Sequence, residues 1–361
     1  MNHRKVALVM AGGTGGHIFP ALATAEKLQE QGVHVEWLGS RQSMEAELIP
    51  KTGIAFHAIE VSGLRGKGKL SLLLAPVKLM MALLQALQVL RAVRPNVVLG
   101  MGGFASGPGG LAAWLLRVPL IVHEQNAVAG MTNKALSGMA KQVLEAFGGA
   151  FKPALKTRVV GNPVRGNILQ MDSPNQRMQN RDGPVRLLVV GGSLGAKAIN
   201  DLLPQVLADI PQNERPEVWH QAGKRNIEQT LQSYQENGVT GCKVVPFIDA
   251  METAYAWADV VLCRAGALTV SELSIAGVAS ILVPFPYAVD DHQTKNGEYL
   301  ATQGAAVLIQ QSELTHDRLK KLLTEQLNQR VTLIDMANKA RELGKPESSQ
   351  VVADVCLEAM K

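Results

Sequence analysis

The chain has 361 residues, of which 47% are hydrophobic and 19% are charged, and its formal net charge is +5. This composition excludes a disordered chain, and because one domain usually has about 100–200 residues, the length predicts two domains. Three scattered cysteines, Cys242, Cys263 and Cys356, form no CxxC pair, which argues against a disulfide framework and a zinc site and indicates a reducing compartment.

Short apolar runs alternate with helical patterns in both halves, which predicts parallel β-sheets flanked by helices. The first run leads into a glycine-rich turn and not into a cleavage site, so we interpret it as a strand and not as a signal peptide. The predicted strands are 5–10, 34–38, 97–100 and 119–122 in the first half, and 186–190, 217–221, 243–245, 259–262 and 280–283 in the second.

The two halves repeat one pattern of strand, glycine turn and helix start, "VMAGGTGGH" at 9–17 and "VVGGSLGAK" at 189–197. Between them, 161–183 is polar and interrupted by Pro and Gly, which predicts a linker. We therefore expect an α/β fold of two Rossmann-like parallel-sheet domains, 1–161 and 162–344, which face each other across a cleft at the carboxyl ends of their strands.

The uncharged stretch from Val97 to Leu116 is long enough to cross a bilayer. Its cluster of glycines and a proline would break a spanning helix. We interpret it instead as a buried strand, a glycine loop and a helix that starts near Leu111.

A basic and apolar segment lies in a region without acidic residues, between Glu60 and Glu124. Helical spacing predicts a core-facing stripe there, and the remaining leucines adjoin lysines. Apolar surface beside a basic rim is typical of a protein that docks on anionic lipid, which we predict for about 64–84; the alternative is that these leucines belong to the core. The stripe is Met80, Leu83, Leu84, Leu87 and Leu90; the surplus leucines are Leu72, Leu73, Leu74 and Leu79, and the cations are Arg65, Lys67, Lys69 and Lys78.

The first glycine turn does not have the spacing of a dinucleotide fingerprint, because its third glycine position is Ile18. The acidic residue near the expected distance, Glu36, lies in the middle of a predicted strand. A glycine turn at a helix N-terminus still presents N–H groups, which suit oxyanions or sugar hydroxyls.

The second glycine turn, with Gly191, Gly192, Ser193 and Gly195, suits phosphate, but it lacks the GK[ST] of a P-loop. Arg165 and Arg264 are cations that could neutralise a diphosphate, although single arginines are more often surface ion pairs. Glu272 could accept two vicinal ribose hydroxyls, and its alternative is an ordinary charge near a helix N-terminus.

His17 follows the first turn, and "HEQNA" at 123–127 follows a predicted strand of the same domain. His17, Glu124 and Asn126 are therefore expected on one wall of the cleft. An imidazole with a pKa near neutrality suits a general base for glycosyl transfer to an alcohol. The alternative is that His17 only caps or packs against the helix.

Seven motifs occur in order along essentially the whole chain. With them the chain resembles the MurG family, the UDP-N-acetylglucosamine–lipid I N-acetylglucosaminyltransferases of bacterial peptidoglycan synthesis. The set is specific, whereas any one motif would be weak. The motifs are "GGTGGH", "GGFASGPGG", "HEQNAVAG", "GNPVR", "GGSLGA", "FIDAM" and "CRAGALTVSE".

The resemblance implies a GT-B fold with the acceptor on the first domain, the donor UDP-GlcNAc on the second, and a last helix (about 345–361) that returns to the first. It implies inverting transfer of N-acetylglucosamine to the C4 hydroxyl of the muramyl sugar of lipid I, which forms lipid II, without a metal or cofactor. It further implies a peripheral protein on the cytoplasmic face of the inner membrane, with other cell-wall enzymes as partners and no nucleic acid.

The resemblance also assigns residues. His17 matches the candidate base, with Glu124 as the fallback. His292 and Gly297, on either side of Gln293 and Asn296, depart from some relatives. The remaining assignments are Thr14, Gly15, Gly16 and Asn126 at the sugar end; Arg165 and Ser193 at the diphosphate; Ile248 at the uracil; Ala267, Leu268, Thr269, Val270, Ser271 and Glu272 around the nucleoside; and Gln293 at the sugar hydroxyls.

Two alternatives stay open at this point. One is another GT-B UDP-sugar transferase with a lipid acceptor, which would have no reason to combine "GGTGGH" with "HEQN". The other is a non-enzymatic membrane scaffold, which would not need polar motifs in both domains.

Overall fold

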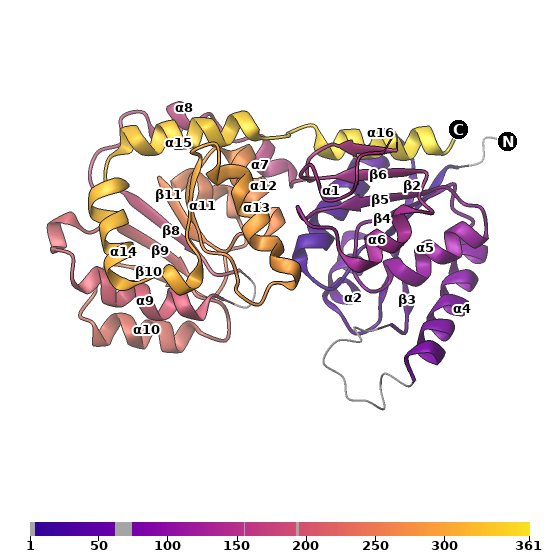
Figure 1. The fold of residues 1–361 in the computed structure, drawn as a ribbon, viewed down its shortest axis with the longest axis horizontal. Coiled ribbons are helices and arrows are strands. Elements are labelled where there is room, and N and C mark those ends of the chain that lie inside the picture. Colours follow the sequence, from indigo (N-terminus) through magenta and orange to yellow (C-terminus); the bar gives the residue numbers. More distant parts are fainter. Residues whose placement is uncertain (1–3, 62–73, 155, 193–194) are drawn as a thin grey trace. The chain divides into compact units, whose positions relative to one another are not determined.

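The structure is a computed structural model that describes residues 4–61, 74–154, 156–192 and 195–361. The chain forms two compact units. Unit 1 comprises Met1–Arg165 and Pro346–Lys361, and unit 2 comprises Gly166–Lys345. Each unit is an α/β structure around a parallel sheet, so the predicted fold of two Rossmann-like domains is confirmed (Figure 1).

In unit 1 the described strands form a seven-stranded sheet in the order β3-β2-β1-β4-β5-β6-β7. The predicted runs are confirmed as β1, β2, β4 and β5, whereas β3, β6 and β7 are not among the predicted strands. Strands β3 and β7 are partly exposed, and β6 has only two apolar residues between Gln142 and Glu145, so none of the three is a continuous apolar run. The bounds are β1 (Val6–Met10), β2 (His34–Ser40), β3 (Ala55–Ile59), β4 (Val97–Gly100), β5 (Leu120–Glu124), β6 (Gln142–Glu145) and β7 (Thr157–Val159).

Helices cover both faces of this sheet. Ala7 and Val9 of β1 face a core formed with α1, α2 and α16, while Leu8 and Met10 face a core formed with α4, α5 and α6. This alternation follows from the two-residue period of a strand that is buried on both faces. The helices are α1 (Gly15–Glu30), α2 (Met44–Leu48), α4 (Ala75–Val93), α5 (Ser106–Leu115), α6 (Met131–Ser137) and α16 (Ser348–Ala359).

In unit 2 the described strands form a six-stranded parallel sheet in the order β10-β9-β8-β11-β12-β13. All five predicted runs are confirmed within one residue, and only the three-residue edge strand β13 is not among them. The bounds are β8 (Arg186–Val190), β9 (Glu217–Gln221), β10 (Lys243–Val245), β11 (Val260–Cys263), β12 (Ala279–Leu282) and β13 (Ala306–Leu308).

One face of this sheet packs on a core that includes α9, α10 and α14, and α11 contacts β8 and α12. The helices are α7 (Gly166–Leu169), α8 (Pro174–Met178), α9 (Lys197–Ala208), α10 (Ile227–Glu236), α11 (Met251–Trp257), α12 (Ala267–Ala276), α13 (His292–Ala301), α14 (His316–Lys321) and α15 (Arg330–Leu343).

The prediction of a linker over 161–183 is wrong. This segment forms α7 and α8 and packs onto unit 2 through the buried side chains of Ile168, Met171 and Met178. Ser173 begins α8 with a capping box, in which its hydroxyl and the Gln176 side chain bond each other's backbone N–H. The polar composition therefore reflects helix caps and buried arginines and not a flexible connection.

The interpretation of 97–116 as a strand, a loop and a helix is correct in outline, but the helix starts earlier than Leu111. Helix α5 begins at Ser106, and Gly107, Gly109 and Gly110 belong to its first turns. A Cβ at Gly109 would lie 2.8 Å from a Leu38 methyl, and one at Gly110 would lie 2.6 Å from a Leu136 methyl. These glycines let α5 approach the sheet and α6 closely.

The predicted core stripe on α4 is also wrong in part. Met80 and Leu84 are 56% and 53% exposed. The buried residues of α4 are three alanines, Ala75, Ala82 and Ala86, and one leucine, Leu90. Small side chains let α4 lie close to α5. Of the predicted stripe, Leu83, Leu87 and Leu90 pack against the core, whereas Met80 and Leu84 are exposed. The predicted cations Arg65, Lys67 and Lys69, with Leu72 and Leu73, lie outside the described residues.

Helix α4 is also long enough and apolar enough to cross a membrane, judged by length and composition alone. Its side chains at Ala82, Ala86 and Leu90 belong to the core of unit 1. We therefore treat it as a surface helix of that unit.

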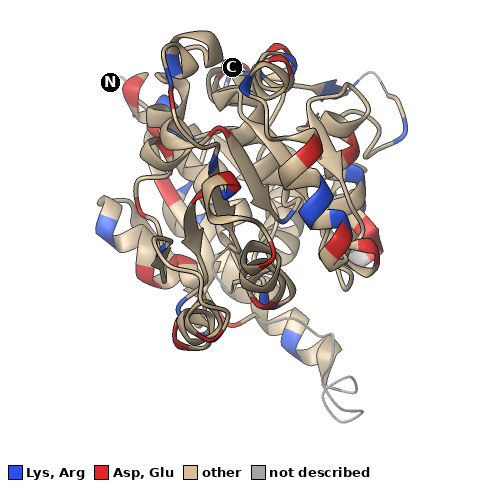
Figure 2. Ribbon diagram, turned by 90° about the vertical axis from the view of Figure 1, so that its left-hand side faces the viewer, with Lys and Arg blue, Asp and Glu red and all other residues tan. Residues whose placement is uncertain are grey.

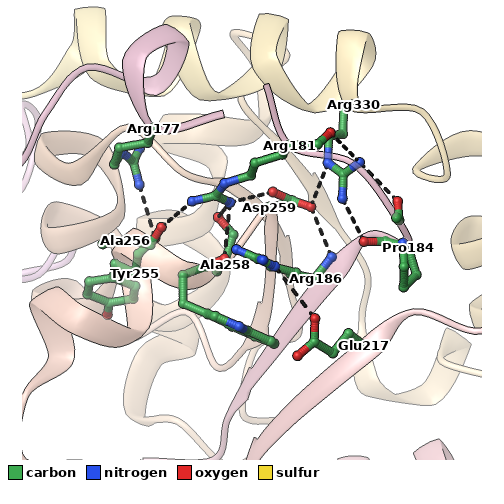
Figure 3. A network of polar contacts seen from close by, with 12 residues as sticks. Arg177, Arg181, Pro184, Arg186, Glu217, Tyr255, Ala256, Ala258, Asp259 and Arg330 are labelled. Atoms are coloured by element: carbon green, nitrogen blue, oxygen red, sulfur yellow. Dashed lines mark hydrogen bonds and ion pairs between the residues drawn. The ribbon is translucent and has the colours of Figure 1, made fainter. Parts of the chain in front are cut away.

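A network of arginines surrounds Asp259 in unit 2 (Figure 3). The Asp259 carboxylate is fully buried and accepts from Arg181 Nη1 (2.6 Å), Arg330 Nε (3.0 Å) and the backbone N–H of Arg186 (3.0 Å). Arg177 donates to the carbonyl oxygens of Tyr255 and Ala276, and burial lowers its pKa to about 10. The network ties α8, α15 and the start of β11 into one unit.

We predict that Asp259→Asn lowers the free energy of unfolding by about 3–5 kcal/mol, because it leaves two buried guanidinium groups without their counter-charge. Urea unfolding followed by circular dichroism measures this. The matched control is Glu217→Gln, which removes an exposed carboxylate 3.5 Å from Arg186 and should cost about 1 kcal/mol or less. Equal effects of the two substitutions would contradict the role given to Asp259.

Candidate functional site

Each sheet has one point where the strand order reverses, between β1 and β4 in unit 1 and between β8 and β11 in unit 2. In open parallel sheets, ligands bind outside the carboxyl ends of the strands at such a point. The turns that follow β1 and β8 are the two glycine turns singled out in the sequence. Topology and sequence thus point to the same turns in both units.

In unit 1 a buried carboxylate accepts a hydrogen bond from the turn after β1. Glu45 of α2 accepts the backbone N–H groups of Gly13 and Ser40, both at 3.0 Å. A Cβ at Gly12 would overlap this carboxylate, and Gly13 has a φ of +88°. Both positions therefore require glycine. Sequence analysis missed Glu45, which no motif marks.

The turn after β4 meets the turn after β1. A Cβ at Gly103 would lie 2.6 Å from the carbonyl oxygen of Gly12, and one at Gly102 would lie 2.8 Å from His17 Nδ1. Ser106 fixes this second turn by donating to the carbonyl oxygens of Gly102 (2.7 Å) and Met10 (3.2 Å). The His17 ring therefore rests on bare backbone.

His17 is half-buried and joins a third turn through Gln125. Its Nδ1 lies 3.0 Å from Gln125 Oε1, and Gln125 Nε2 donates to the carbonyl oxygen of Met101 at 2.9 Å. Sequence analysis quoted Gln125 within "HEQNA" but gave it no role. Its place directly after β5, between two residues that were singled out, is the signal that could have found it.

Glu124, the fallback base, is 2% exposed, and both of its oxygens accept hydrogen bonds. Oε1 accepts from the backbone and side chain of Asn126, and Oε2 accepts from Gly130 N (3.0 Å) and Asn133 Nδ2 (2.9 Å). Such a carboxylate anchors the loop that carries Asn126. The geometry favours this anchoring role over a role as base.

His123 is fully buried beside these residues. Its Nε2 donates to the carbonyl oxygen of Gly161 at 2.9 Å. Burial lowers the pKa of His123 to about 4, although the bond to Gly161 and the charge of Glu124 oppose the shift. His123 is therefore neutral at physiological pH.

The other predicted residues of unit 1 lie at the start of α1. Thr14 is exposed and is the N-cap, and Gly15 and Gly16 form the first turn with half-buried backbone. Phe19 covers Gly15, where a Cβ would lie 2.9 Å from its ring. The Arg165 guanidinium lies over the same ring, 5.2 Å from its centroid.

In unit 2 the turn after β8 is equally bare. A Cβ at Gly191 would lie 2.6 Å from the backbone N of Ala196, and Gly192 and Gly195 both have a φ of +77°. Gln221 Nε2 donates to the carbonyl oxygen of Gly192 at 3.0 Å. Ser193 lies outside the described residues.

A buried polar chain supports this turn, and sequence analysis missed it. Asn200 Nδ2 donates to the carbonyl oxygen of Ala222 at 2.9 Å, and Asn200 Oδ1 lies 3.0 Å from His220 Nε2. The other ring nitrogen of His220 lies 3.0 Å from the Tyr234 hydroxyl. Burial lowers the pKa of His220 to about 3, so this ring is neutral and structural.

The segment 267–272 forms the first turns of α12, directly after β11. Leu268 and Thr269 are half-buried, and Ala267, Val270 and Ser271 are buried. Glu272 is only 4% exposed, and its Oε2 accepts from the Tyr255 hydroxyl at 3.1 Å. It is therefore a buried carboxylate and not an exposed charge at a helix terminus.

Two further predicted residues of unit 2 are Ile248, which lies in a loop, and Gln293, which lies at a helix start. Ile248 is buried in the segment between β10 and α11. Gln293 is at the start of α13, and its Oε1 accepts the backbone N–H of Phe285 at 2.9 Å. Gly297 has a packing reason, because a Cβ there would lie 2.6 Å from a Leu308 methyl.

Arg264 has a structural role in the loop after β12. It donates to the carbonyl oxygens of Val283 and Pro284 and to Gln311 Oε1 at 2.6 Å. Its cation also lies 5.6 Å from the centroid of the Phe285 ring. The geometry favours this role over neutralisation of a diphosphate.

Among the side chains that the structure describes, there is no group of three or more His, Cys, Asp and Glu residues that could hold a metal ion.

Comparisons with known proteins agree over both units. Residues 7–145 match the N-terminal domain of glycosyltransferase family 28, and 186–352 match its C-terminal domain. Two curated relatives are named UDP-N-acetylglucosamine–N-acetylmuramyl-(pentapeptide) pyrophosphoryl-undecaprenol N-acetylglucosamine transferase. The one from Marinobacter nauticus is 54% identical and covers 99% of this chain and 98% of its own length. The one from Nitrosococcus oceani is 52% identical, with 97% and 98% covered.

A solved structure is similar over the same extent. The crystal structure of Acinetobacter baumannii MurG is 42% identical, with a TM-score of 0.85, and the match covers 98% of this chain and 99% of that one.

Proposed function

This chain belongs to glycosyltransferase family 28, and we propose that it transfers N-acetylglucosamine from UDP to lipid I, the undecaprenyl-pyrophosphoryl muramyl peptide, to form lipid II. The observation that carries the proposal is the match of both units, over nearly their whole length, to relatives named for this activity. The two Rossmann-like units agree with the GT-B fold that the resemblance implies.

The acceptor chemistry is assigned to unit 1. Transfer with inversion at the anomeric carbon needs a base for the acceptor hydroxyl, here the C4 hydroxyl of the muramyl sugar. His17 supports this role because it is half-buried, rests on bare backbone and is held by one ring nitrogen. Thr14, Gly15, Gly16 and Asn126 would bind the sugar around it.

The donor chemistry is assigned to unit 2. The glycine turn after β8 precedes α9, so its N–H groups and the helix dipole favour the diphosphate of UDP-GlcNAc. Ser193 would add a hydroxyl, and no metal or cofactor is needed for a leaving group stabilised in this way. Arg165, which belongs to unit 1, stays a predicted ligand of the diphosphate. Ile248, 267–272 and Gln293 would bind the uracil, the nucleoside and the sugar.

The membrane proposal places the chain as a peripheral protein on the cytoplasmic face of the inner membrane. The described start of α4 exposes Leu74, Val77, Leu79, Met80, Met81 and Leu84. Helix α4 carries Lys78 and Arg91 and no acidic residue, and Figure 2 shows its first turns, next to the grey trace, in tan and blue only. An apolar face with cations suits anionic lipid, where lipid I resides. Other cell-wall enzymes stay predicted partners.

Transfer of labelled N-acetylglucosamine from UDP to a short-chain lipid I analogue tests the proposed activity. We expect lipid II product with UDP-N-acetylglucosamine and little with UDP-glucose. Product on other lipid alcohols but not on the lipid I analogue would favour another UDP-sugar transferase. A scaffold would give no product, and UDP-GlcNAc would not raise its melting temperature.

We predict that His17→Ala lowers kcat by roughly 10²–10⁴, because the acceptor hydroxyl loses its base. The Kd for UDP-GlcNAc, measured by calorimetry, should stay nearly unchanged. His34→Ala is the matched control, since His34 is a partly exposed histidine of unit 1 that contacts Glu36. A His17→Ala enzyme with most of its activity would show that another group is the base.

We predict that Glu272→Gln weakens UDP-GlcNAc binding about tenfold, because charge-assisted hydrogen bonds to two ribose hydroxyls become neutral ones. Tyr255→Phe is the matched control, because it removes the hydrogen bond to Glu272 and keeps the carboxylate. If Glu272→Gln lowers the melting temperature but leaves the donor Kd unchanged, the carboxylate is structural and the ribose assignment is wrong.

We predict that Val77→Ser, Met80→Gln and Leu84→Gln together weaken binding to phosphatidylglycerol vesicles at least about tenfold, since each buried apolar side chain contributes ~1.5–3 kcal/mol. Cosedimentation measures this, and binding of the unaltered protein should fall as salt rises. Leu231→Gln with Val331→Ser, which alters exposed apolar residues of unit 2, is the matched control. Unchanged binding by the α4 variant would remove this helix from the membrane face.

A further inference from the structure

We propose that Gln125 is a positioning residue that holds His17 in one tautomer, with the proton on Nδ1 and the lone pair on Nε2. The inference rests on the proposed role of His17 and deepens it. It gives a function to the residue of "HEQNA" that lies between the loop anchor Glu124 and the predicted sugar ligand Asn126.

The orientation of the Gln125 amide follows from its partner in the turn after β4. The carbonyl oxygen of Met101 can only accept a hydrogen bond, so the amide group 2.9 Å from it must be the NH₂. The amide oxygen then faces His17 Nδ1 at 3.0 Å. Because this oxygen can also only accept, Nδ1 must carry the proton, and in the neutral ring Nε2 is left as the acceptor.

The surroundings prevent the opposite arrangement. Gln125 is 1% exposed and Met101 is fully buried. A flipped amide would place its oxygen against the Met101 carbonyl oxygen, 2.9 Å away, and leave that buried carbonyl without its donor. The His17 ring also has no room to shift toward Gly102. It already lies so close that a Cβ added at Gly102 would be only 2.8 Å from Nδ1.

The partner of His17 is an amide and not a carboxylate, which has a consequence for its basicity. A carboxylate next to Nδ1 would stabilise the imidazolium strongly and raise the pKa of His17. An amide oxygen fixes the tautomer and orients the ring, and it adds no charge of its own. The hydrogen bond strengthens when Nε2 takes a proton, because its donor becomes charged.

Charged neighbours do not replace Gln125 in this role. His123 is near enough to interact electrostatically with His17, but burial lowers the pKa of His123 to about 4, so it is neutral near pH 7. Both oxygens of Glu124 accept hydrogen bonds from Asn126, Gly130 and Asn133. In the described structure, the side chain that bonds the His17 ring is Gln125.

Nitrogen-15 NMR of the full chain with labelled imidazoles tests the tautomer directly, and His17→Gln identifies the His17 signals. At pH 8 we expect a protonated Nδ1 and an unprotonated Nε2 in the unaltered protein. In Gln125→Leu the signals should shift toward the form with the proton on Nε2. If His17 keeps its Nδ1–H tautomer in Gln125→Leu, the inference is overturned.

Kinetics provide the second readout. Gln125→Leu should lower kcat about tenfold, the effect of losing one hydrogen bond of this kind, with little change in the KM for UDP-GlcNAc. Gln85→Leu is the matched control, because Gln85 Oε1 accepts the backbone N–H of Glu60 in the same unit without contact to His17. The control should keep the unaltered kcat and the Nδ1–H tautomer.

The variant Gln125→Glu separates an effect on the orientation of the His17 ring from an effect on folding. Its carboxylate should keep the proton on Nδ1 and raise the pKa of His17, so the acid limb of the kcat/KM profile should move to higher pH. An unmoved limb together with an unchanged tautomer in Gln125→Leu would overturn the inference. If the tautomer changes in Gln125→Leu but kcat does not, the positioning role stands and the role of His17 as base fails.

Discussion

The candidate sites depend on one steric constraint, the close approach of backbone segments at the reversal points of the two sheets. Gly103 lies so near Gly12 that a Cβ would come within 2.6 Å of the Gly12 carbonyl oxygen, and Gly191 has the same relation to the backbone of Ala196. Glycine is required at both positions, because a Cβ would overlap the neighbouring backbone. The same constraint lets the His17 ring rest on Gly102. Bare backbone therefore forms both the glycine turn that we propose for the diphosphate and the surface on which the His17 ring lies.

Both units contain a buried amide side chain that bonds a backbone turn and a histidine. In each unit a buried amide side chain donates to the carbonyl oxygen of a neighbouring turn and directs its own oxygen at a histidine: Gln125 at His17, and Asn200 at His220. His220 is fully buried with both ring nitrogens engaged, and burial lowers its pKa to about 3. His17 is only half-buried. The two histidines therefore differ in burial and in the number of ring nitrogens that have a partner, although each faces an amide oxygen.

The strands at the centre of each sheet were predictable because strands buried on both faces are continuous apolar runs. The edge strands β3, β7 and β13 are short or partly polar, so their pairing partners, and not their own residues, define them. The start of α5 was predicted too late, because its glycines allow close helix packing and do not form a loop. Polarity misled it in 161–183, because the arginines there bind buried carbonyl oxygens and Asp259.

The glycine turns, His17 and the "HEQNA" loop were predictable because local motifs mark them. Glu45 and the Asn200–His220–Tyr234 chain were not, because their roles arise from residues far apart in sequence that meet only in the folded sheet. Exposure on α4 was misjudged for a related reason. A helical stripe of leucines predicts a buried face only if larger side chains pack best, whereas α4 approaches its neighbour through alanines.

The last helix gives unit 1 a particular order of assembly. Helix α16 packs against α1 and β4, and Val352, Ala353, Val355 and Cys356 are part of the same core as Ala7 and Val9 at the other end of the chain. During synthesis on the ribosome, the whole of unit 2 is made before this helix emerges. Unit 2 is continuous in sequence and can fold as soon as it is released, whereas unit 1 keeps an uncovered apolar face until α16 has been made. The nascent first unit is thus the stage at which this protein most needs protection from aggregation.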